Sequence, residues 1–213
     1  MQDSPPQAST SSPRVGYARS RETRARILAA ALAEASDVGF HKTSVARIAA
    51  RAGVAVGNLH YHFGSKAGLL RELMVSLVTD LRSQLQVSIP SDSADFFDHE
   101  RAGLLAYLEW LRANPAYARL ADEVRLHDPD LYQRALEGWV DQFVLRVRSA
   151  IDGGFIRQMS DHEIRANGYF FLGTHQYLDR LMEADPYPGD AAIADAYLGL
   201  VRNGLGRSPD PTD

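Results

Sequence analysis

Cysteine is absent from this chain of 213 residues, and lysine occurs only twice. Without cysteine there is no disulfide, no thiolate metal site and no redox chemistry at sulfur, which fits a reducing compartment. Long apolar runs are also lacking, because the longest aliphatic stretch, ILAAALAEA, is too short to span a bilayer. The first residues have neither the basic nor the apolar segment of a signal peptide. We therefore expect a soluble, cytoplasmic protein.

Signatures of common enzymes are missing as well. The sequence has no G-x-S-x-G elbow, no phosphate loop of the GxxxxGK type and no G-x-G-x-x-G fingerprint. The stretch DHEIRA begins like a zinc-protease helix, but Ala166 stands where the second histidine is needed. His60 and His62 are two residues apart, so on a helix they point about 200° away from each other and cannot share a metal ion. The sequence thus predicts no enzyme, no metal site and no cofactor.

Charge is distributed unevenly along the chain. Residues 1–72 hold 10 Lys and Arg against 5 Asp and Glu, a net charge of +5, whereas residues 73–213 hold 13 against 22, a net charge of −9. Both lysines, Lys42 and Lys66, lie in the basic part. A basic N-terminal third suits a polyanion, which the acidic remainder would repel.

Apolar residues recur at helical spacing, and no run alternates with period two for long enough to form a sheet, so we expect an all-α fold. The first 13 residues, rich in Pro, Ser, Thr and Gln, should be disordered. The expected helices span residues 20–38, 45–52, 56–63 and 65–87, and then about 94–113, 115–126, 129–152, 160–184 and 190–205. The expected parts are a tail at 1–13, a three-helix domain at 14–64, a larger helical domain at 65–205 and a tail at 206–213.

Two short helices joined by a tight turn are predicted between Thr43 and Phe63. Thr43 or Ser44 can cap the first helix, and Gly53 allows the positive φ that ends it. A pair of short helices with glycine in the turn is typical of a helix-turn-helix unit, whose second helix enters the major groove of DNA. Any tight corner between two helices would give a similar pattern, so the motif by itself leaves both interpretations open.

The second short helix carries His60, Tyr61 and His62, and Lys66 stands at the start of the helix that follows. The three side chains can donate hydrogen bonds, and a lysine at a helix start combines its charge with free N–H groups that attract phosphate. This pattern indicates a recognition surface. The alternative is that Tyr61 and His62 only pack between helices.

Residues from about 19 to 70 resemble the DNA-binding domain of the TetR (tetracycline repressor) family of bacterial regulators. The resemblance rests on a long helix, Gly-Phe, Thr-Ser, IAARAGV, YHF and SKAGLL in that order. It implies an all-helical homodimer in which residues 14–64 form the helix-turn-helix domain and residues 65–205 bind an effector and dimerise. Carried over by position, the residues that would contact phosphates are Thr43, Ser44 and Lys66, and those that would form the recognition face are Asn58, His60, Tyr61 and His62.

Three positions depart from the family pattern. Ala55 stands where a capping serine is frequent, which removes an N-cap of about 1 kcal/mol. Val56 replaces a polar or basic side chain and could pack on a thymine methyl group in DNA. His60 stands in place of a frequent tyrosine. The mode of DNA binding can therefore be expected from the family, but the operator sequence cannot.

The larger domain has no comparable motif. Its apolar stripe at 129–152 is wide enough for burial on two sides. Seven residues are expected to line an effector pocket for an apolar or aromatic ligand, or else to pack in the core: Tyr107, Trp110, Tyr117, Trp139, Phe143, Phe171 and His175. Nine residues are expected at the dimer interface: Phe171, Leu172, His175, Leu178, Ile193, Ala196, Tyr197, Leu200 and Val201.

The sequence as a whole predicts a homodimeric transcriptional regulator, a repressor that binds a pseudo-palindromic operator in double-stranded DNA and is released by an unidentified small molecule. One alternative is a constitutive DNA-binding dimer whose larger domain serves only dimerisation or a protein partner. Another is an all-helical enzyme that carries a helix-turn-helix unit.

Overall fold

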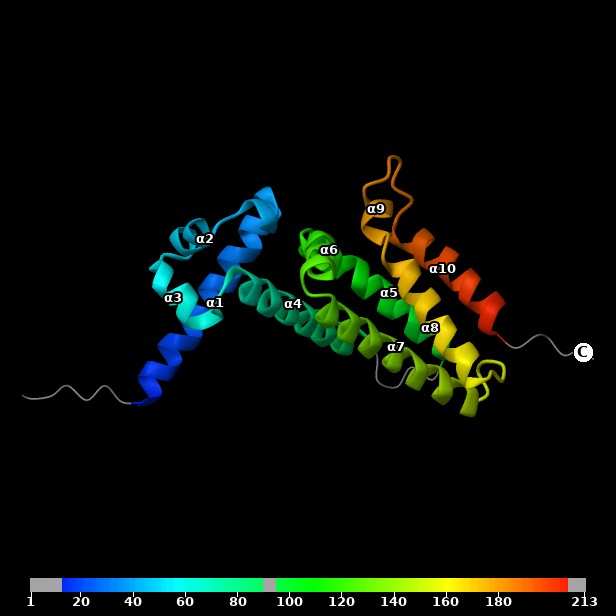
Figure 1. The fold of residues 1–213 in the computed structure, drawn as a ribbon. Helices are drawn as coiled ribbons and strands as arrows, with labels where there is room; N and C mark the ends of the chain where they lie inside the picture. Colours follow the sequence, from blue (N-terminus) through cyan, green and yellow to red (C-terminus); the bar gives the residue numbers. More distant parts are fainter. Residues whose placement is uncertain (1–12, 90–94, 207–213) are drawn as a thin grey trace, which may run out of the picture. The chain divides into compact units, whose positions relative to one another are not determined.

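The computed structural model describes residues 13–89 and 95–206 (Figure 1). In these ranges the chain forms α-helices and one short 3-10 helix, and its only β pairing is an isolated bridge between Ile156 and Gly206. The prediction of an all-α fold is confirmed. The predicted tail at 1–13 lies outside the described residues except for Pro13, which begins the first helix. The predicted tail at 206–213 likewise lies outside them except for Gly206.

The chain divides into two compact units, one up to Leu73 and the other from Met74 onwards. The division falls within a helix, α4 (Lys66–Ser88), rather than before it, where the sequence predicted the boundary. The first turns of α4 belong to the N-terminal unit because Leu69, Leu70 and Leu73 are buried there.

The N-terminal unit consists of α1 (Pro13–Val38), η1 (Phe40–Lys42), α2 (Val45–Ala52), α3 (Val56–Phe63) and the start of α4. Gly39 has φ 85°, which lets the chain turn from α1 into η1. Helices α2 and α3 have the bounds that the sequence predicted, whereas α1 begins at Pro13 instead of near residue 20. The core contains Ile27, Ala31, Phe40, Ile48, Leu59, Phe63, Leu69 and Leu73.

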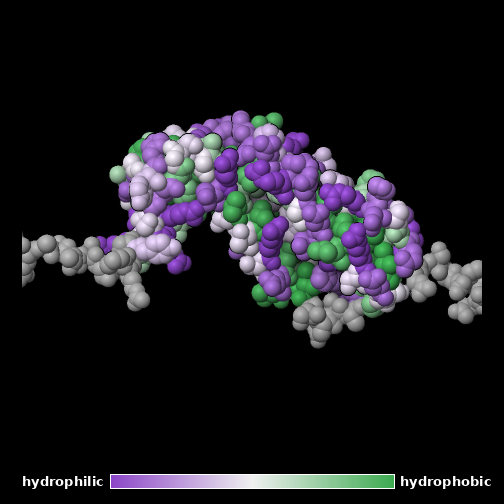
Figure 2. Space-filling view, turned by 60° about the horizontal axis from the view of Figure 1, so that its bottom comes forward, coloured by the Kyte–Doolittle hydropathy of each residue, from purple (hydrophilic) through white to green (hydrophobic). Residues whose placement is uncertain are grey.

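The C-terminal unit consists of the rest of α4, α5 (Phe96–Ala113), α6 (Tyr117–His127), α7 (Pro129–Asp152), α8 (Asp161–His175), α9 (Leu178–Met182) and α10 (Asp190–Leu205). Helix α7 packs against α6 and α8, and α10 packs against α5. Helices α7 and α10 have the predicted bounds. In Figure 2 one face of this unit has apolar patches, shown in green, among polar residues.

The single helix predicted at 160–184 is wrong, because the chain forms two helices, α8 and α9, over this range. The Thr174 hydroxyl and the His175 ring nitrogen Nδ1 lie 2.6 and 2.8 Å from the carbonyl oxygen of Phe171. Side chains that bond to a backbone carbonyl compete with the helical hydrogen bond at that position. The chain leaves helical geometry at Tyr177, where φ is −115°.

Candidate nucleic-acid interface and aromatic cluster

The corner between α2 and α3 is held by both backbone and side-chain contacts. The Ser44 hydroxyl accepts from the Arg47 N–H at 3.2 Å and so caps α2, while Gly53 ends this helix with φ 64°. The guanidinium of Arg26 on α1 donates to the carbonyl oxygens of Ala52 and Gly53 at 2.6 and 2.8 Å. The two short helices therefore form the predicted helix-turn-helix unit, with a corner tied to α1.

Helix α3 has a buried side and an exposed side. Leu59 and Phe63 are buried, whereas Asn58 and His60 are exposed and 82% of the Tyr61 side chain is accessible. The Nδ1 atom of His60 lies 3.1 Å from the carbonyl oxygen of Gly64, so its other ring nitrogen remains available.

Two further predicted residues lie at the edges of this exposed side. Val56 is 42% exposed at the start of α3. His62 is partly buried, and its ring lies edge-on to Tyr61 with centroids 5.1 Å apart. The residues predicted for base contacts are thus brought together on one short helix, and His62 is the least accessible of them.

Thr43 does not have the predicted exposed position. Its side chain is buried, and its hydroxyl donates to Glu34 at 3.1 Å, so it cannot reach a phosphate. Glu34, which the sequence did not single out, also pairs with Arg47 at 2.9 Å and Arg51 at 3.1 Å. The hydrogen bond from Arg51 holds the pKa of Glu34 below its usual range, with further contributions from Thr43 and Arg47, although burial acts in the opposite direction.

Lys66 points toward the protein backbone. Its ammonium donates to the carbonyl oxygens of His41 and Thr43 at 3.1 and 2.7 Å, and it lies 5.2 Å from the ring centroid of Phe40. Since an ammonium has three N–H donors, these contacts leave one for another partner. Lys66 therefore ties the start of α4 to the segment before α2, a structural role that the sequence did not indicate.

In the C-terminal unit, six of the seven residues predicted for an effector pocket form a connected aromatic cluster. Tyr107 stacks on Trp110, and Trp110 meets Tyr117 edge-on with centroids 4.9 Å apart. His175 joins the two ends of the cluster, at 5.5 Å from Tyr107 and 4.3 Å from Phe171. The predicted members of the cluster are Tyr107, Trp110, Tyr117, Phe143, Phe171 and His175, and Tyr197 on α10 joins them through ring contacts with Phe171 and His175.

Trp139 is the one predicted pocket residue outside the cluster, and Trp110 lies at its most buried end. The Trp139 ring lies under the guanidinium of Arg82 on α4, 5.0 Å from its centroid, and within the described part of the chain it makes no ring contact with the cluster. Trp110 is fully buried, and its indole N–H donates to Asp80 at 2.7 Å, which makes it a packing residue.

A buried charged group lies beside the cluster. Glu100 on α5 is only 4% exposed; it accepts from Arg146 Nε at 3.1 Å and from the Tyr197 hydroxyl at 3.0 Å. The Arg146 guanidinium lies over the rings of Phe143 and Phe171 at 5.8 and 5.7 Å. This buried carboxylate was not predicted from the sequence, although Glu100 interrupts the apolar spacing from Phe96 to Leu104 and Leu108, a signal that could have identified it.

Burial shifts the titration of the cluster toward neutral forms. It lowers the pKa of His175 and raises the pKa values of Tyr107 and Tyr197, and it raises the pKa of Tyr117 to about 12. The hydroxyls of Tyr107 and Tyr117 have no hydrogen-bond partner within the part of the chain that the structure describes. At neutral pH they are two unused donors in apolar surroundings.

The residues predicted for dimerisation differ in their accessibility. Leu178, Ile193 and Tyr197 are buried inside the protomer, so these three are not free to form an interface, whereas Phe171 is partly exposed and packs on Phe143. Consecutive helical residues point about 100° apart, which leaves Phe170 72% and Tyr177 67% exposed instead. Of the predicted interface residues, Ala196 and Leu200 are exposed, and Leu172, His175 and Val201 are partly exposed.

Among residues 13–89 and 95–206, no group of three or more His, Cys, Asp or Glu side chains is arranged to hold a metal ion. Over the same ranges, no helix combines the length and the apolar character needed to cross a membrane.

Comparison with known proteins identifies the helix-turn-helix unit. Residues 27–73 match the model of the bacterial regulatory proteins of the tetR family. This unit matches the DNA-binding domain of the TetR family. A curated relative, the HTH-type transcriptional regulator BetI 1 of Chromohalobacter salexigens, is 31% identical over 122 residues, which are 55% of this chain. The match spans 60% of that relative's length. The TetR-family relatives are named as transcriptional regulators, not as enzymes.

Solved structures of TetR-family proteins have the same fold over most of this chain. A TetR-family transcriptional regulator from Pectobacterium atrosepticum is 25% identical with a TM-score of 0.67, and the match covers 91% of this chain and 98% of that one. A regulatory protein of the tetR family from Rhodococcus RHA1 is 20% identical with a TM-score of 0.70, covering 88% and 98%. At this level of identity the second likeness concerns the fold alone.

Proposed function

We propose that this chain is a TetR-family repressor that binds a pseudo-palindromic operator in double-stranded DNA as a homodimer and is released by a small-molecule effector. The observation that carries the proposal is the exposed side of α3. Asn58, His60 and Tyr61 stand clear of the core while Leu59 and Phe63 anchor the helix, so a rigid element presents polar side chains to a groove.

Each residue on the exposed side of α3 is suited by its chemistry to a particular contact with DNA. Asn58 can form two hydrogen bonds with an adenine edge, and Val56 can pack on a thymine methyl group. His60 and Tyr61 can bond to base edges or phosphates, and the partly buried His62 orients Tyr61 through their edge-on contact.

Phosphate contacts are expected at the exposed Ser44, which lies at the N-terminus of α2, and at the third N–H of Lys66. Because the contacts of Lys66 with His41 and Thr43 are already made, this last contact is a secondary role.

A second copy of the chain is the proposed partner of the C-terminal unit. Phe170 and Tyr177 on or next to α8, Leu181 on α9 and Leu200 on α10 expose large apolar side chains. Gly199 and Gly204 on α10 have open space where a Cβ would lie, so another helix can approach closely. A two-fold pair of protomers would present two α3 helices to inverted half-sites.

The aromatic cluster is the proposed effector site. Tyr107, Phe171 and His175 keep partial solvent access although they lie among packed helices, and the unused hydroxyls of Tyr107 and Tyr117 can hydrogen-bond to a ligand. These features support a planar, largely apolar ligand with a polar group. They favour a ligand-responsive regulator over a constitutive dimer.

Selection from random duplex DNA by the purified chain tests the proposal. An enriched inverted repeat, with half-sites about one helical turn apart or more, is the expected result. Binding without enrichment that disappears at moderate salt would leave only phosphate contacts and contradict operator recognition. With the selected operator as probe, a compound that raises the unfolding temperature of the chain should also release the DNA. A compound that binds the aromatic cluster without changing operator affinity would contradict the effector role.

A further inference from the structure

Six arginines of the N-terminal unit fall into two groups. In one group the guanidinium is engaged inside the unit: Arg24 pairs with Glu72, Arg26 binds the carbonyl oxygens at the end of α2, and Arg47 and Arg51 pair with Glu34. In the other group, Arg19 and Arg21 are exposed and have no partner among the residues that the structure describes. Two guanidinium groups on one helix are therefore left for a ligand.

These two arginines stand on a regular helix. Helix α1 already begins at Pro13, so Arg19 and Arg21 have fixed positions on its early turns, with Tyr17 70% exposed beside them. Between residues 13 and 26 the chain has five arginines, and Glu22 is its only acidic residue. The sequence of this segment is therefore strongly basic, which suits a polyanion.

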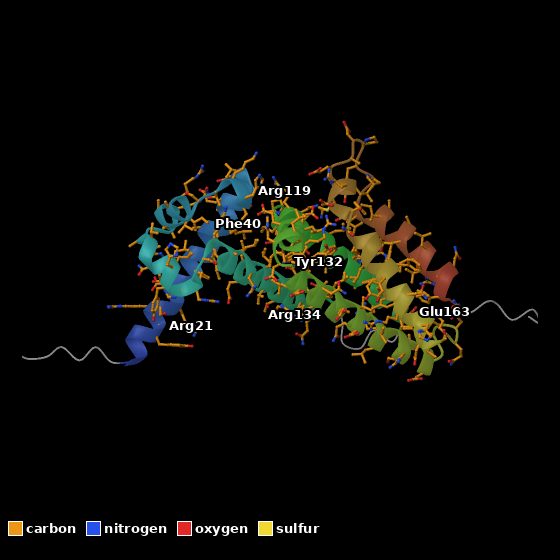
Figure 3. All side chains as sticks on the ribbon, in the orientation of Figure 1. Arg21, Phe40, Arg119, Tyr132, Arg134 and Glu163 are labelled. Atoms are coloured by element: carbon orange, nitrogen blue, oxygen red, sulfur yellow. The ribbon has the colours of Figure 1, made fainter. Side chains whose placement is uncertain are left out.

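Arg19 and Arg21 are each spaced by whole turns of α1 from an arginine that contacts the helix-turn-helix unit. Arg21 lies three residues, or about one turn, before Arg24, whose guanidinium is 5.4 Å from the ring of Phe63 at the end of α3. Figure 3 labels Arg21 on the part of α1 that extends past α3 in Figure 1.

Arg19 lies on the side of α1 that contacts the end of α2. Arg19 stands seven residues, or about two turns, before Arg26, on the same side of α1. Arg26 in turn binds the carbonyl oxygens of Ala52 and Gly53. Because they are two residues apart, Arg19 and Arg21 point to opposite sides of α1, one toward the end of α2 and the other toward the end of α3.

We propose that the early turns of α1 form a second DNA-contact site, in which Arg19 and Arg21 bind backbone phosphates beside the base pairs that α3 contacts. The inference rests on the proposed operator binding. From Pro13 to Arg24 the helix is about 16 Å long, compared with about 12 Å for the width of the major groove and about 6 Å for the minor groove. This stretch of α1 is therefore long enough to reach phosphates beside the groove that α3 enters, and guanidinium groups bind phosphates well.

The test compares the full-length chain with the double variant Arg19→Ala/Arg21→Ala on two duplexes. Both contain the operator found by selection, and one of them lacks the flanking base pairs. On the longer duplex the variant should bind about tenfold or more weakly, and the slope of log K against log salt should fall by about 0.9 for each lost phosphate contact. On the trimmed duplex wild type and variant should bind equally. The variant Arg19→Lys/Arg21→Lys, which keeps both charges, should retain most of the slope.

A matched control removes the same charge elsewhere. Arg119 on α6 and Arg134 on α7, both labelled in Figure 3, are exposed and also lack a partner within the described ranges. The variant Arg119→Ala/Arg134→Ala should bind both duplexes like wild type. An equal loss of affinity in this control would show a general charge effect and overturn the inference. So would an equal loss of affinity on both duplexes by Arg19→Ala/Arg21→Ala. If Arg19→Ala/Arg21→Ala bound the longer duplex like wild type, the inference would be overturned too. If wild type bound neither duplex, the proposed function itself would be contradicted.

Discussion

The ammonium of Lys66 donates to the carbonyl oxygen of Thr43 across 2.7 Å, and this contact joins the start of α4 to the residue that precedes the cap of α2. The same ammonium donates to His41 and lies over the ring of Phe40. Lys66 thus acts on the helix-turn-helix unit through the backbone segment before α2, by fixing where this helix begins. This role differs from a simple phosphate contact, because replacing Lys66 should then lower the stability of the unit as well as its affinity for DNA.

We expect Lys66→Ala to lower the free energy of unfolding by about 1–2 kcal/mol, because two charge-assisted hydrogen bonds are lost from a partly exposed site. Urea denaturation measures the change. Lys42→Ala is the control, since Lys42 is exposed without a partner in the described ranges, and it should change stability by less than about 0.5 kcal/mol. Weaker DNA binding by Lys66→Ala with unchanged stability would contradict the positioning role.

Asn58→Ala should reduce discrimination between operator and random DNA. An amide with two hydrogen bonds to a base contributes about 1–3 kcal/mol of preference for that base, whereas non-specific binding depends on phosphates. We therefore expect the ratio of the two affinities to fall about tenfold or more, with binding to random duplex unchanged. Titrations at one salt concentration measure both. An equal loss on both DNAs would place Asn58 against the backbone instead.

The lowered pKa of Glu34 makes the N-terminal unit sensitive to acid. Because Arg51, Thr43 and Arg47 stabilise the ionised carboxylate, its contribution is complete above the ordinary pKa of about 4.3 and disappears as pH falls through the lower value of the folded state. Glu34→Gln should thus be less stable than wild type at pH 7, and the difference should shrink in acid. Unfolding curves between neutral and acidic pH check this, and a difference that is constant with pH would refute it.

The dimer interface is testable through Phe170 and Leu200, which are 72% and 71% exposed. Phe170→Asp/Leu200→Asp places two charges where apolar surface should meet a second copy, so dimer affinity should fall by more than about tenfold. Sedimentation velocity at several concentrations measures the shift to monomer. Leu126→Asp on α6 is the control because Leu126 is equally exposed, at 72%, and lies outside the proposed face. Dissociation by the control alone would place the interface at α6.

Local sequence signals sufficed for the helix-turn-helix unit. A cap at Ser44, a glycine at position 53 and the short spacing to Phe63 act within a few residues, so the bounds of α2 and α3 could be predicted from sequence. The role of Lys66 could not, because its acceptors lie in η1 and at the residue after it, more than twenty residues earlier in the chain. The same holds for Thr43, whose hydroxyl is engaged by Glu34 on another helix.

The larger domain was harder to predict because its helices carry apolar residues on more than one side. Phe171 and His175 were predicted from the sequence both for the effector pocket and for the dimer interface, because the sequence could not tell which neighbour faces inward. Phe170 and Phe171 are equally apolar, and only the packing of Phe171 on Phe143 decides the matter. The pairing of Glu100 with Tyr197 joins residues almost a hundred positions apart, beyond any local pattern.

Glu100 and Arg146 should be strongly coupled. Glu100→Leu removes the carboxylate and leaves the Arg146 guanidinium among the rings of Phe143 and Phe171 without its ionic partner, a change that costs about 3 kcal/mol or somewhat less because Arg146 keeps some solvent access. Arg146→Met in turn leaves Glu100 buried with only the Tyr197 hydroxyl as donor. The double variant has neither unpaired charge, so it should be more stable than the sum of the single losses predicts, by about 1–3 kcal/mol. Urea unfolding of the four proteins gives this coupling energy. Additive losses would mean that each charge is solvated independently, and that the buried pair does not hold α5 and α7 together at the aromatic cluster.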